Sequence, residues 1–544
     1  MPVYALALSL LVTGPLLGPG YLLLRDAVST PRSYLTDAAL GLSEAAPRAL
    51  PQDFFVAITS TVLDGGVVVK ALLVAGLWLA GWGAARLAAE VLPEAGTAGQ
   101  FIAATLAIWN PYVAERLLQG HWSLLVGYGC LPWVALAAVR LRTGWPGVPA
   151  LAFWIALAGL TPTGLMLAAT VALACVAAPG DGWRRWRVAV LGLGLSVLAA
   201  VPWLVAAAIG SSVSSASAAG VQAFAARAEP GLGTLGSLAG LAGIWNGDAV
   251  PASRTTLFAL LATVVLLGIV ALGLPVAIRT PAAVPLLVLA VLAVLIPSAM
   301  ATGPGLAFVE SVIRSVPGLG VVRDGQKWVA LAMPGYALAA SAAPLALRRL
   351  RVPVVAGAAV CCAALLAVLP DLAWSVGGQV HAVRYPPAWA SVAATINADP
   401  RPVAVLPPDS IRQFSWAGTV LDPLPRWLRA EVLTTGDLSI GGQTVPGEGV
   451  HARAVQALVL SNASPQELAD AGVGWVVRES DGDVTAQRVG GSAPAAPGRA
   501  VMIGAHLVWL ALLIGGAMGM AAGRVSNAVA RTRAFSRRGV TGAD

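Results

Sequence analysis

The 544-residue chain contains few charged residues. Only 11% of its residues are Asp, Glu, Lys or Arg, whereas 57% are hydrophobic, and its mean hydropathy is +0.78. Soluble domains carry about 25% charged residues, so this composition excludes a soluble enzyme. The apolar fraction also excludes a disordered chain, and the 60 Gly and 38 Pro show no triplet period of a collagen. We therefore expect a protein that crosses the membrane several times.

Cysteine and histidine are also scarce, with four residues of each. The cysteines lie in apolar runs, and Cys361 and Cys362 are adjacent, so no disulfide framework or metal-ligand spacing follows. We expect no cofactor, and no sequence feature supports a divalent cation. The chain also lacks a Walker or dinucleotide-binding glycine pattern after any predicted strand, which argues against ATP-driven transport by this chain alone.

Long apolar runs predict the membrane-spanning helices. Each span needs about 20 apolar residues to cross a hydrocarbon core about 30 Å thick. About twelve runs qualify, at residues 3–24, 66–87, 99–115, 123–140, 149–161, 164–178, 188–209, 255–277, 282–302, 327–347, 353–369 and 500–523. The fifth and sixth are short and flank Pro162, so one broken or re-entrant hairpin is the alternative. The first run is too long, and lacks the cleavage site, for a removable signal peptide.

The basic residues indicate the orientation of these spans. An even number of spans places both termini on one side, and the segments on that side carry 15 of the 34 basic residues but only four of the 26 acidic ones. The positive-inside rule then predicts a multi-pass plasma-membrane protein with both termini in the cytoplasm. Because this asymmetry accounts for the net charge of +8, nothing supports a nucleic-acid partner.

We divide the chain into a transmembrane core, an outer domain, a last span and a basic cytoplasmic tail, at residues 1–369, 370–499, 500–523 and 524–544. The core has three long outer loops, at residues 25–65, 210–254 and 303–326. In the outer domain, Val403–Leu406 and Gly474–Val477 are typical of buried strands, and Pro465–Ala471 of a helix. The expected fold class is an all-α polytopic membrane protein with a small extracytoplasmic α/β domain.

Ionisable residues at the outer ends of spans are costly to hold near lipid, so their clusters are candidate sites. The first cluster is Arg25-Asp26, directly after the first span. A partly desolvated carboxylate has a raised pKa, which suits a general base, while a neighbouring arginine lowers it again. The alternative is an ion pair that only marks the end of the helix.

The second cluster lies between the third and fourth spans, where Asn110-Pro111 would break the helix near the outer leaflet. Glu115, Arg116, Gln119 and His121 follow within about two helical turns, close enough to place their polar groups in one pocket. The alternative is a structural turn in which Glu115 pairs with Gln119 or Arg116.

The third cluster is Arg323-Asp324-Gly325-Gln326-Lys327, at the outer end of the tenth span. An arginine and a lysine at headgroup height can clamp a phosphate, although they can also anchor a helix end against lipid headgroups. A fourth, weaker candidate is the glycine-rich outer loop with Trp245 near its tip, which would line a glycan groove or simply be a mobile loop.

This arrangement resembles the GT-C class of integral-membrane glycosyltransferases, which take sugars from polyprenyl-phosphate donors. The stretch from Asn110-Pro111 to Gly120-His121 is similar to a pattern in polyprenyl-phosphate mannosyl- and arabinosyltransferases, with His121 where glutamine is usual. The segments at 243–246 and 323–328 look like parts of actinobacterial membrane proteins and of the arabinofuranosyltransferases of their cell wall.

The resemblance implies that mannose or arabinofuranose is transferred to an envelope polysaccharide or glycolipid outside the cytoplasm. The family's catalytic base is an aspartate of the first outer loop, which Asp26 matches best, although many members have two acids together there; Glu115 is the second choice. The substrate-binding candidates are Arg25, Asn110, Arg116, Gln119, His121, Trp245, Arg323, Asp324 and Lys327. The outer domain would bind the acceptor. The alternatives are a flippase for a lipid-linked envelope intermediate and a noncatalytic scaffold of an envelope-assembly complex.

Overall fold

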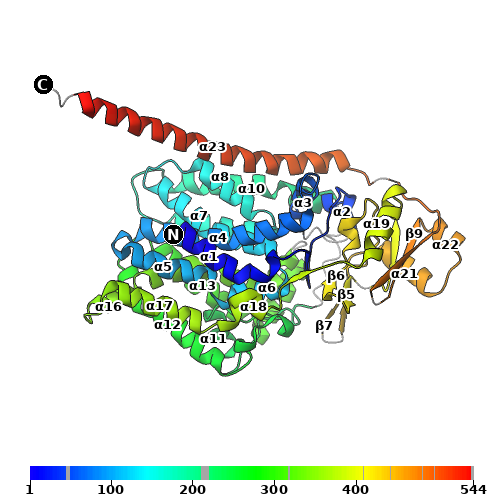
Figure 1. Ribbon diagram of the computed structural model, residues 1–544, viewed down its shortest axis with the longest axis horizontal. Helices are drawn as coiled ribbons and strands as arrows, with labels where there is room; N and C mark the ends of the chain where they lie inside the picture. The colour runs from blue at the N-terminus through cyan, green and yellow to red at the C-terminus, as the bar shows by residue number, and fades with distance from the viewer. Residues whose placement is uncertain are drawn as a thin grey trace.

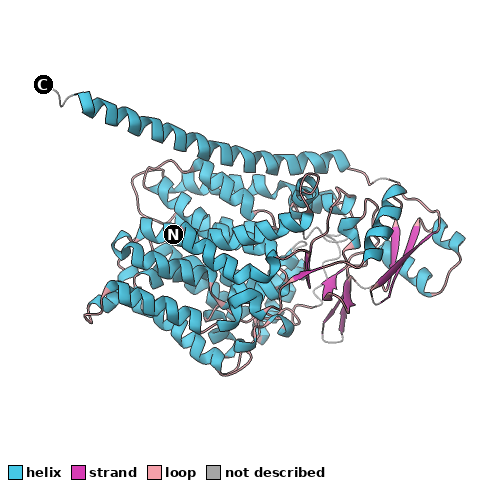
Figure 2. Ribbon diagram, in the orientation of Figure 1, coloured by secondary structure: helices cyan, strands magenta, loops and turns pink. Residues whose placement is uncertain are grey.

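The computed structural model describes residues 1–44, 49–209, 220–315, 319–408, 410–440, 443–480, 482–494 and 496–540. It has a large body of helices with small β-sheets gathered at one end, as Figures 1 and 2 show. The helices of the body are α1 (Pro2–Thr13), α4 (Gly65–Val91), α5 (Gly96–Ile108), α6 (Pro111–Gln119), α7 (Trp122–Arg142), α8 (Val148–Ala158), α9 (Pro162–Cys175), α10 (Arg185–Ile209), α12 (Phe258–Ala277), α13 (Val284–Met300), α15 (Ala332–Ser341), α16 (Ala343–Arg348), α17 (Val354–Ala367) and α23 (Arg499–Val540). Further helices lie between them in the chain: α2 (Asp37–Leu40), α3 (Gln52–Thr59), α11 (Gly233–Ala239), α14 (Gly303–Ser315) and α18 (Ala373–Gly377).

Small residues allow the central helices to pack closely. A Cβ atom added to Gly129 of α7 would lie 2.1 Å from the carbonyl oxygen of Gly76 in α4, so the two backbones touch at this crossing. Lipid is as apolar as the side chains, so helix association in a membrane depends on such close van der Waals contact. The last long helix, α23, packs against α8 and α10 at the edge of the body (Figure 1).

The chain is a membrane protein, but the predicted count of twelve spans is not confirmed. In the described residues, six helices are long and apolar enough to cross a membrane, or eight if each of two bent helix pairs is one span. The predicted third span breaks at Asn110 into α5 and α6, because Pro111 begins a new helix there. The helices at the predicted fifth and sixth spans, α8 and α9, have only 11 and 14 residues. Eleven residues rise about 16 Å, about half of the hydrocarbon thickness.

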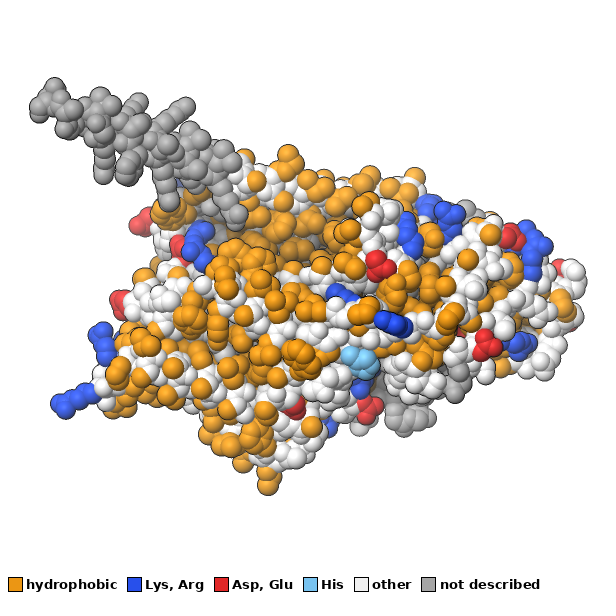
Figure 3. All heavy atoms as spheres, viewed as in Figure 1, with side chains coloured by type: hydrophobic (Ala, Val, Ile, Leu, Met, Phe, Trp, Pro, Cys, Tyr) orange, Lys and Arg blue, Asp and Glu red, His pale blue; other side chains and the backbone are white. Residues whose placement is uncertain are grey.

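The surface of the helical body is strongly apolar. Figure 3 shows hydrophobic side chains over most of the body, whereas charged side chains gather toward its two ends. α1 begins, and α23 ends, on the side of the body away from the sheets (Figure 1). Both termini therefore lie opposite the sheets, while the side that faces the cytoplasm stays a prediction.

The sheet-containing region beyond α18 is an α/β structure. β4 (Val403–Leu406) pairs in parallel with β9 (Trp475–Ser480), which pairs antiparallel with β10 (Asp483–Arg488). The helices α19 (Pro387–Ala398), α20 (Leu424–Trp427), α21 (Val450–Leu460) and α22 (Pro465–Asp470) accompany this sheet, and two hairpins are formed by β5 (Ile411–Phe414) with β6 (Gly418–Leu421) and by β7 (Leu438–Ile440) with β8 (Gln443–Val445). The strands predicted at 403–406 and 474–477 are present. They are neighbours in one sheet.

A second three-stranded sheet joins this region to the helical body. β1 (Tyr21–Leu24), which follows α1, pairs antiparallel with β2 (Ala27–Val28) on one side and with β3 (Ala382–Val383) on the other. Residues about 360 positions apart in sequence thus share a sheet at the end of the body. This hairpin could not be predicted from the sequence, because its turn lacks the Asn-Gly or Asp-Gly signal.

Candidate active site

A two-residue turn between β1 and β2 presents Arg25 and Asp26 at the end of the helical body. Arg25 has a φ of +47°, in the left-handed region that two-residue hairpin turns use. Hydrogen bonds to β6 hold the backbone in this conformation: the Arg25 amide donates to the carbonyl of Thr419 at 2.7 Å, and the amide of Leu421 donates to the Arg25 carbonyl at 2.8 Å. The α/β region therefore fixes the turn that carries the predicted base.

The Arg25 guanidinium is engaged within the protein. It donates to the backbone carbonyl oxygens of Leu118 and Asp248, the latter at 2.6 Å. Among the ion pairs of the described residues there is none between Arg25 and Asp26, so the simple helix-end pair considered from the sequence is not formed. Arg25 instead ties the hairpin to the end of α6 and to the loop that contains Trp245.

Asp26 receives two hydrogen bonds on one carboxylate oxygen. Its Oδ2 atom lies 2.8 Å from Nε2 of His121 and accepts from Nε2 of Gln119 at 3.1 Å. The backbone amide of Asp26 also donates to the carbonyl of Gln119 at 3.1 Å. The side chain of Asp26 remains 37% exposed, so it is accessible to a substrate. The structure thus brings together three residues that the sequence placed in two separate clusters.

The surroundings of Asp26 favour its ionised form. Partial burial of the carboxyl group opposes ionisation, but the hydrogen bonds from His121 and Gln119, with the positive charge of Lys327, outweigh burial and lower the pKa of Asp26. A carboxylate that is ionised at neutral pH and open on one side can accept a proton from a bound hydroxyl.

Gly120 permits this close approach. It ends α6 with φ +83°, and a Cβ atom there would lie 2.3 Å from the carbonyl oxygen of Leu24 and 2.4 Å from the amide nitrogen of Ala27. Both atoms flank the hairpin turn. Only glycine fits this position, because it needs both the left-handed conformation and the absent side chain.

Arg116 lies behind His121 in a fully enclosed network. Its guanidinium donates to Nδ1 of His121 at 3.0 Å and to the two carboxylate oxygens of Asp324 at 3.1 and 3.4 Å, and it also bonds Oε1 of Gln326. The side chain of Arg116 is 0% exposed. This differs from the predicted contact with a donor phosphate, because no part of the guanidinium reaches the surface.

Glu115, the second candidate for the base, is buried too. Its carboxylate accepts from the backbone amides of Gly243 and Ile244, both at 3.1 Å, and from Nε2 of Gln326 at 2.9 Å. Neither the Gln119 nor the Arg116 pairing considered from the sequence appears in its hydrogen bonds. With both oxygens bonded and the residue 0% exposed, Glu115 fixes the 243–246 loop against α6.

Asn110 has a structural role as well. Its Oδ1 caps α6 by accepting from the amide of Val113 at 3.2 Å, and its Nδ2 donates to the carbonyl of Leu106 at 2.8 Å and to the hydroxyl of Tyr128 at 3.0 Å. The residue is 1% exposed. The predicted break at Asn110-Pro111 is therefore correct, but the amide contacts no part of the Asp26 cluster.

The third predicted cluster meets the other two. Lys327 lies in η7 (Gly325–Leu331); its Nζ atom is 3.6 Å from Oδ2 of Asp324, and its side chain is 23% exposed. The charge of Lys327 interacts with that of Asp26 and with that of Arg323. Lys327 is thus a partly accessible cation beside the accessible carboxylate.

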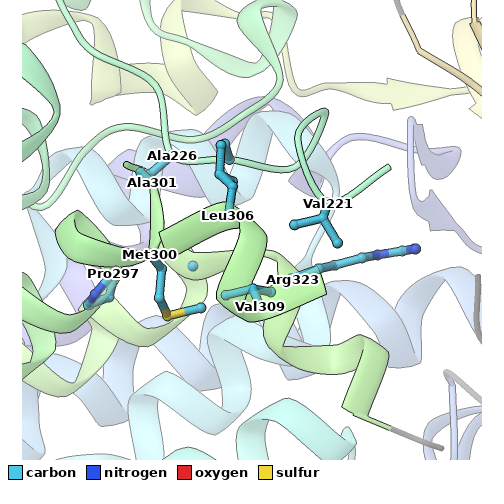
Figure 4. A pocket seen from close by; sticks show the side chains of 10 residues that line it. Val221, Ala226, Pro297, Met300, Ala301, Leu306, Val309 and Arg323 are labelled. Atoms are coloured by element: carbon cyan, nitrogen blue, oxygen red, sulfur yellow. The ribbon is translucent and has the colours of Figure 1, made fainter. Parts of the chain in front are cut away.

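Arg323 and Trp245 are linked through an aromatic ring. The guanidinium carbon of Arg323 lies 4.2 Å from the ring centroid of Phe224, and that ring packs edge-on against Trp245 at 4.6 Å. Arg323 also borders a pocket of about 220 Å³, open mouth included, whose other walls are aliphatic side chains such as Met300 and Leu306. Figure 4 shows Arg323 extending past Val309 below Val221 in this pocket.

The other aspartates of the first outer loop, Asp37, Asp53 and Asp64, are occupied. Asp37 forms an ion pair with Arg499, and Asp53 pairs with Arg426 at 3.2 Å. Asp64 caps α4 and accepts from Tyr21. Among the described residues, no group of three or more His, Cys, Asp or Glu side chains gathers to hold a metal ion. Asp26 is therefore the acid of this region best placed to meet a substrate.

Two residues of the site were absent from the predicted set. Gln326 is 0% exposed and connects Arg116 to Glu115. Asn246 donates to Oε1 of Gln119 at 2.8 Å. Both lie next to predicted residues, but a single uncharged amide side chain gives no sequence signal of burial or of its hydrogen-bond partner.

No protein-family model and no curated protein matches the chain. Its fold is similar to that of arabinofuranosyltransferase AftD from Mycobacteria, with a TM-score of 0.57 and 18% identity over 88% of this chain. A structure of a mutant of that enzyme matches with a TM-score of 0.55 and 19% identity. The likeness to a membrane arabinofuranosyltransferase that the sequence indicated is therefore confirmed at the level of the fold. The chain spans about a third of the length of these structures, 35% and 36%.

Proposed function

We propose that this protein is a membrane glycosyltransferase that transfers a sugar from a polyprenyl-phosphate donor to an envelope polysaccharide or glycolipid on the extracytoplasmic side. One observation carries the proposal: an accessible, ionised carboxylate, Asp26, lies beside a partly accessible cation, Lys327, at the end of an apolar helical body. The fold it shares with an arabinofuranosyltransferase supports the same reaction class and makes arabinofuranose the first sugar to test.

The proposed reaction uses the two groups in complementary ways. The acceptor hydroxyl loses its proton to Asp26 as its oxygen bonds to the anomeric carbon of the donor sugar. The bond from that carbon to the phosphate oxygen breaks, and the electron pair leaves with the polyprenyl phosphate. Lys327 stabilises the departing phosphate as a point charge, and Arg323 lies within electrostatic range of Lys327 to assist it.

The position of the site suits both substrates. The donor's polyprenyl chain is soluble only in lipid, and the helical body offers an apolar surface toward the end next to the sheets (Figure 3). The hairpin of β1 and β2 carries Asp26 at this end. The acceptor is polar, and the α/β region adjoins the hairpin through β6 and β3. We therefore assign acceptor binding to residues 370–499 and place them outside the cytoplasm.

A flippase is the main rival in another class. Moving a lipid-linked headgroup across the membrane requires polar or ionisable residues along its path. The helices α12, α13, α15 and α17 contain no Asp, Glu, Lys or Arg. The ionisable groups lie instead toward the two ends of the body, and those of the candidate site lie together at the end next to the sheets, as a transfer reaction at one membrane surface requires.

Replacing Asp26 with Asn tests the proposal. The amide keeps the size of the side chain but cannot accept the proton, so transfer should fall by about 10²- to 10⁴-fold. The assay measures sugar transfer from a radiolabelled polyprenyl-phosphate arabinofuranose or mannose pool to envelope glycan, with donor binding and thermal unfolding measured on the same samples.

The matched control is Asp53→Asn, which removes a carboxylate of the same outer segment away from the site. It should leave transfer near wild type. Full transfer by the Asp26→Asn variant would overturn the assignment of the base. The flippase would be favoured if the wild type moved the lipid across vesicle membranes without transferring sugar. The scaffold would be favoured if an envelope complex needed the chain but did not need Asp26.

A further inference from the structure

The hydrogen-bond chain behind Asp26 determines which atoms carry protons. An arginine guanidinium has only donors, so Nδ1 of His121, 3.0 Å from Nη1 of Arg116, must accept. The single imidazole proton then lies on Nε2, which donates to Oδ2 of Asp26 at 2.8 Å. This tautomer is assigned from the chemistry of Arg116, which cannot accept a hydrogen bond.

The orientation of the second donor to Asp26, the side-chain amide of Gln119, also follows from its hydrogen-bond partners. The backbone amide of Asp248 can only donate, and it bonds Oδ1 of Asn246 at 3.1 Å. The Nδ2 group of Asn246 therefore donates to Oε1 of Gln119, which leaves Nε2 of Gln119 to donate to Asp26. Both donors meet the same oxygen, Oδ2. Among the described residues, Oδ1 of Asp26 has no hydrogen-bond partner.

Arg116 cannot turn away to release Nδ1 of His121. Its guanidinium is held by both oxygens of Asp324 and by Gln326, and it is 0% exposed. The charged groups that face His121 are Asp26 from the hairpin, Arg116 from α6, and Asp324 and Lys327 before and within η7. Burial lowers the pKa of His121, and the cations Arg116 and Lys327 lower it further, against the opposing effect of Asp26.

We infer that Arg116 locks His121 as a neutral imidazole with its proton on Nε2, and that His121 acts as a positioning residue that directs Oδ1 of Asp26 toward the acceptor hydroxyl. This inference rests on the proposed function for the identity of the hydroxyl. The proton taken from the acceptor stays on Oδ1 of Asp26 until the product leaves. It does not pass to His121, because Nε2 of the imidazole already carries a proton. The lone pair on Nδ1 accepts the hydrogen bond from Arg116.

The tautomer can be measured without any turnover. In the full-length protein, labelled with ¹⁵N-histidine and reconstituted in lipid, solid-state NMR separates the neutral tautomers and the imidazolium by the shifts of the two ring nitrogens. The chain has four histidines, and the His121→Gln variant identifies the signal of His121 by its loss. We expect the Nε2–H tautomer from pH 5 to pH 8. An imidazolium, or a proton on Nδ1, at neutral pH would overturn the inference.

Two substitutions at His121 test the positioning role, because one keeps a hydrogen-bond donor near Asp26 and the other removes it. Glutamine can place its Nε2 group near the position of the imidazole Nε2 and accept from Arg116 through Oε1, so His121→Gln should keep transfer within about threefold of wild type. His121→Ala removes the donor and should lower kcat by about 10- to 100-fold, the range of a lost hydrogen bond to a charged group.

The pH profile separates positioning from proton relay. If His121 only positions Asp26, the wild type and His121→Gln should show the same single acidic ionisation. The inference would be overturned if His121→Gln lost as much activity as His121→Ala. It would also be overturned if the wild type showed an ionisation near pH 6 to 7 that disappeared in His121→Gln. Inactivity of the wild type with every donor would contradict the proposed function, while the NMR result would still decide the state of His121.

Discussion

Replacing Gly120 with Ala should break the contact between α6 and the hairpin that carries Asp26. An alanine in the left-handed conformation at φ +83° costs about 1 to 2 kcal/mol. The added Cβ atom would also lie 2.3 Å from the carbonyl oxygen of Leu24 and 2.4 Å from the amide of Ala27, and overpacking of this kind costs about 1 to 3 kcal/mol more. We expect the free energy of unfolding to fall by about 2 to 5 kcal/mol.

The same change should impair the site before it unfolds the protein. The backbone must separate at the hairpin, which lengthens the bonds from Asp26 to Gln119 and His121, so transfer should fall by about 10- to 100-fold in samples that remain folded. Stability is measured by SDS titration in mixed micelles, and transfer is measured with the radiolabelled donor below the onset of unfolding.

Gly378 provides a matched control. It also adopts the left-handed conformation, at φ +85°, after a turn of residues with positive φ, but a Cβ atom there would have nothing within 4 Å. Gly378→Ala should therefore cost only the conformational part, about 1 to 2 kcal/mol, and keep full transfer. Equal stability and equal activity of the Gly120 and Gly378 variants would refute the reasoning, because only the Gly120 variant places a Cβ atom against the hairpin.

Three further predictions concern charge and orientation. Burial of Asp324 opposes its ionisation, but the Arg116 guanidinium outweighs burial and lowers the pKa of Asp324 to about 2 from its usual 3.8. The ionised pair therefore contributes stability on the order of 2 kcal/mol, which is present above pH 4 and is lost as the pH falls toward 2. Asp324→Asn should abolish this pH dependence of unfolding. Lys327→Ala should weaken donor binding by about 10- to 100-fold in a titration with polyprenyl-phosphate sugar, whereas unchanged affinity would make Lys327 a lipid anchor. A reporter fused after Ala500 should be found outside the cytoplasm and one after Arg538 inside it, and the opposite result would exclude every site proposed here.

The sequence predicts the helical body and the three ionisable clusters because composition and spacing determine both. Apolar runs identify helices, and charges near their ends are rare enough to stand out. Composition cannot show that Asp26 and His121 are joined by a hydrogen bond, because they come from segments about 95 positions apart in the chain. Nor can it show burial: Arg116 and Lys327 look equally available in the sequence, but only Lys327 reaches the surface.

The number of spans was harder to predict for a related reason. Hydropathy measures how apolar a segment is, and a helix enclosed by other helices is as apolar as one that faces lipid. α8 and α9 are apolar but too short to cross alone, and α5 ends at Ile108, shortly before the side chain of Asn110 caps the next helix. Only the length and direction of each helix in space separate these cases.

The hairpin that carries Asp26 makes the α/β region a mechanical part of the proposed catalytic centre. β1 pairs with β3, and the Arg25 backbone pairs with β6, so a rotation of residues 370–499 would carry the base with it. A shortened chain that lacked these residues would therefore lose the geometry of the base as well as the acceptor surface. Conversely, an acceptor that bound to the α/β region and moved it would also move the hairpin. A crosslink between β3 and β1 would hold Asp26 in place and prevent this coupled movement.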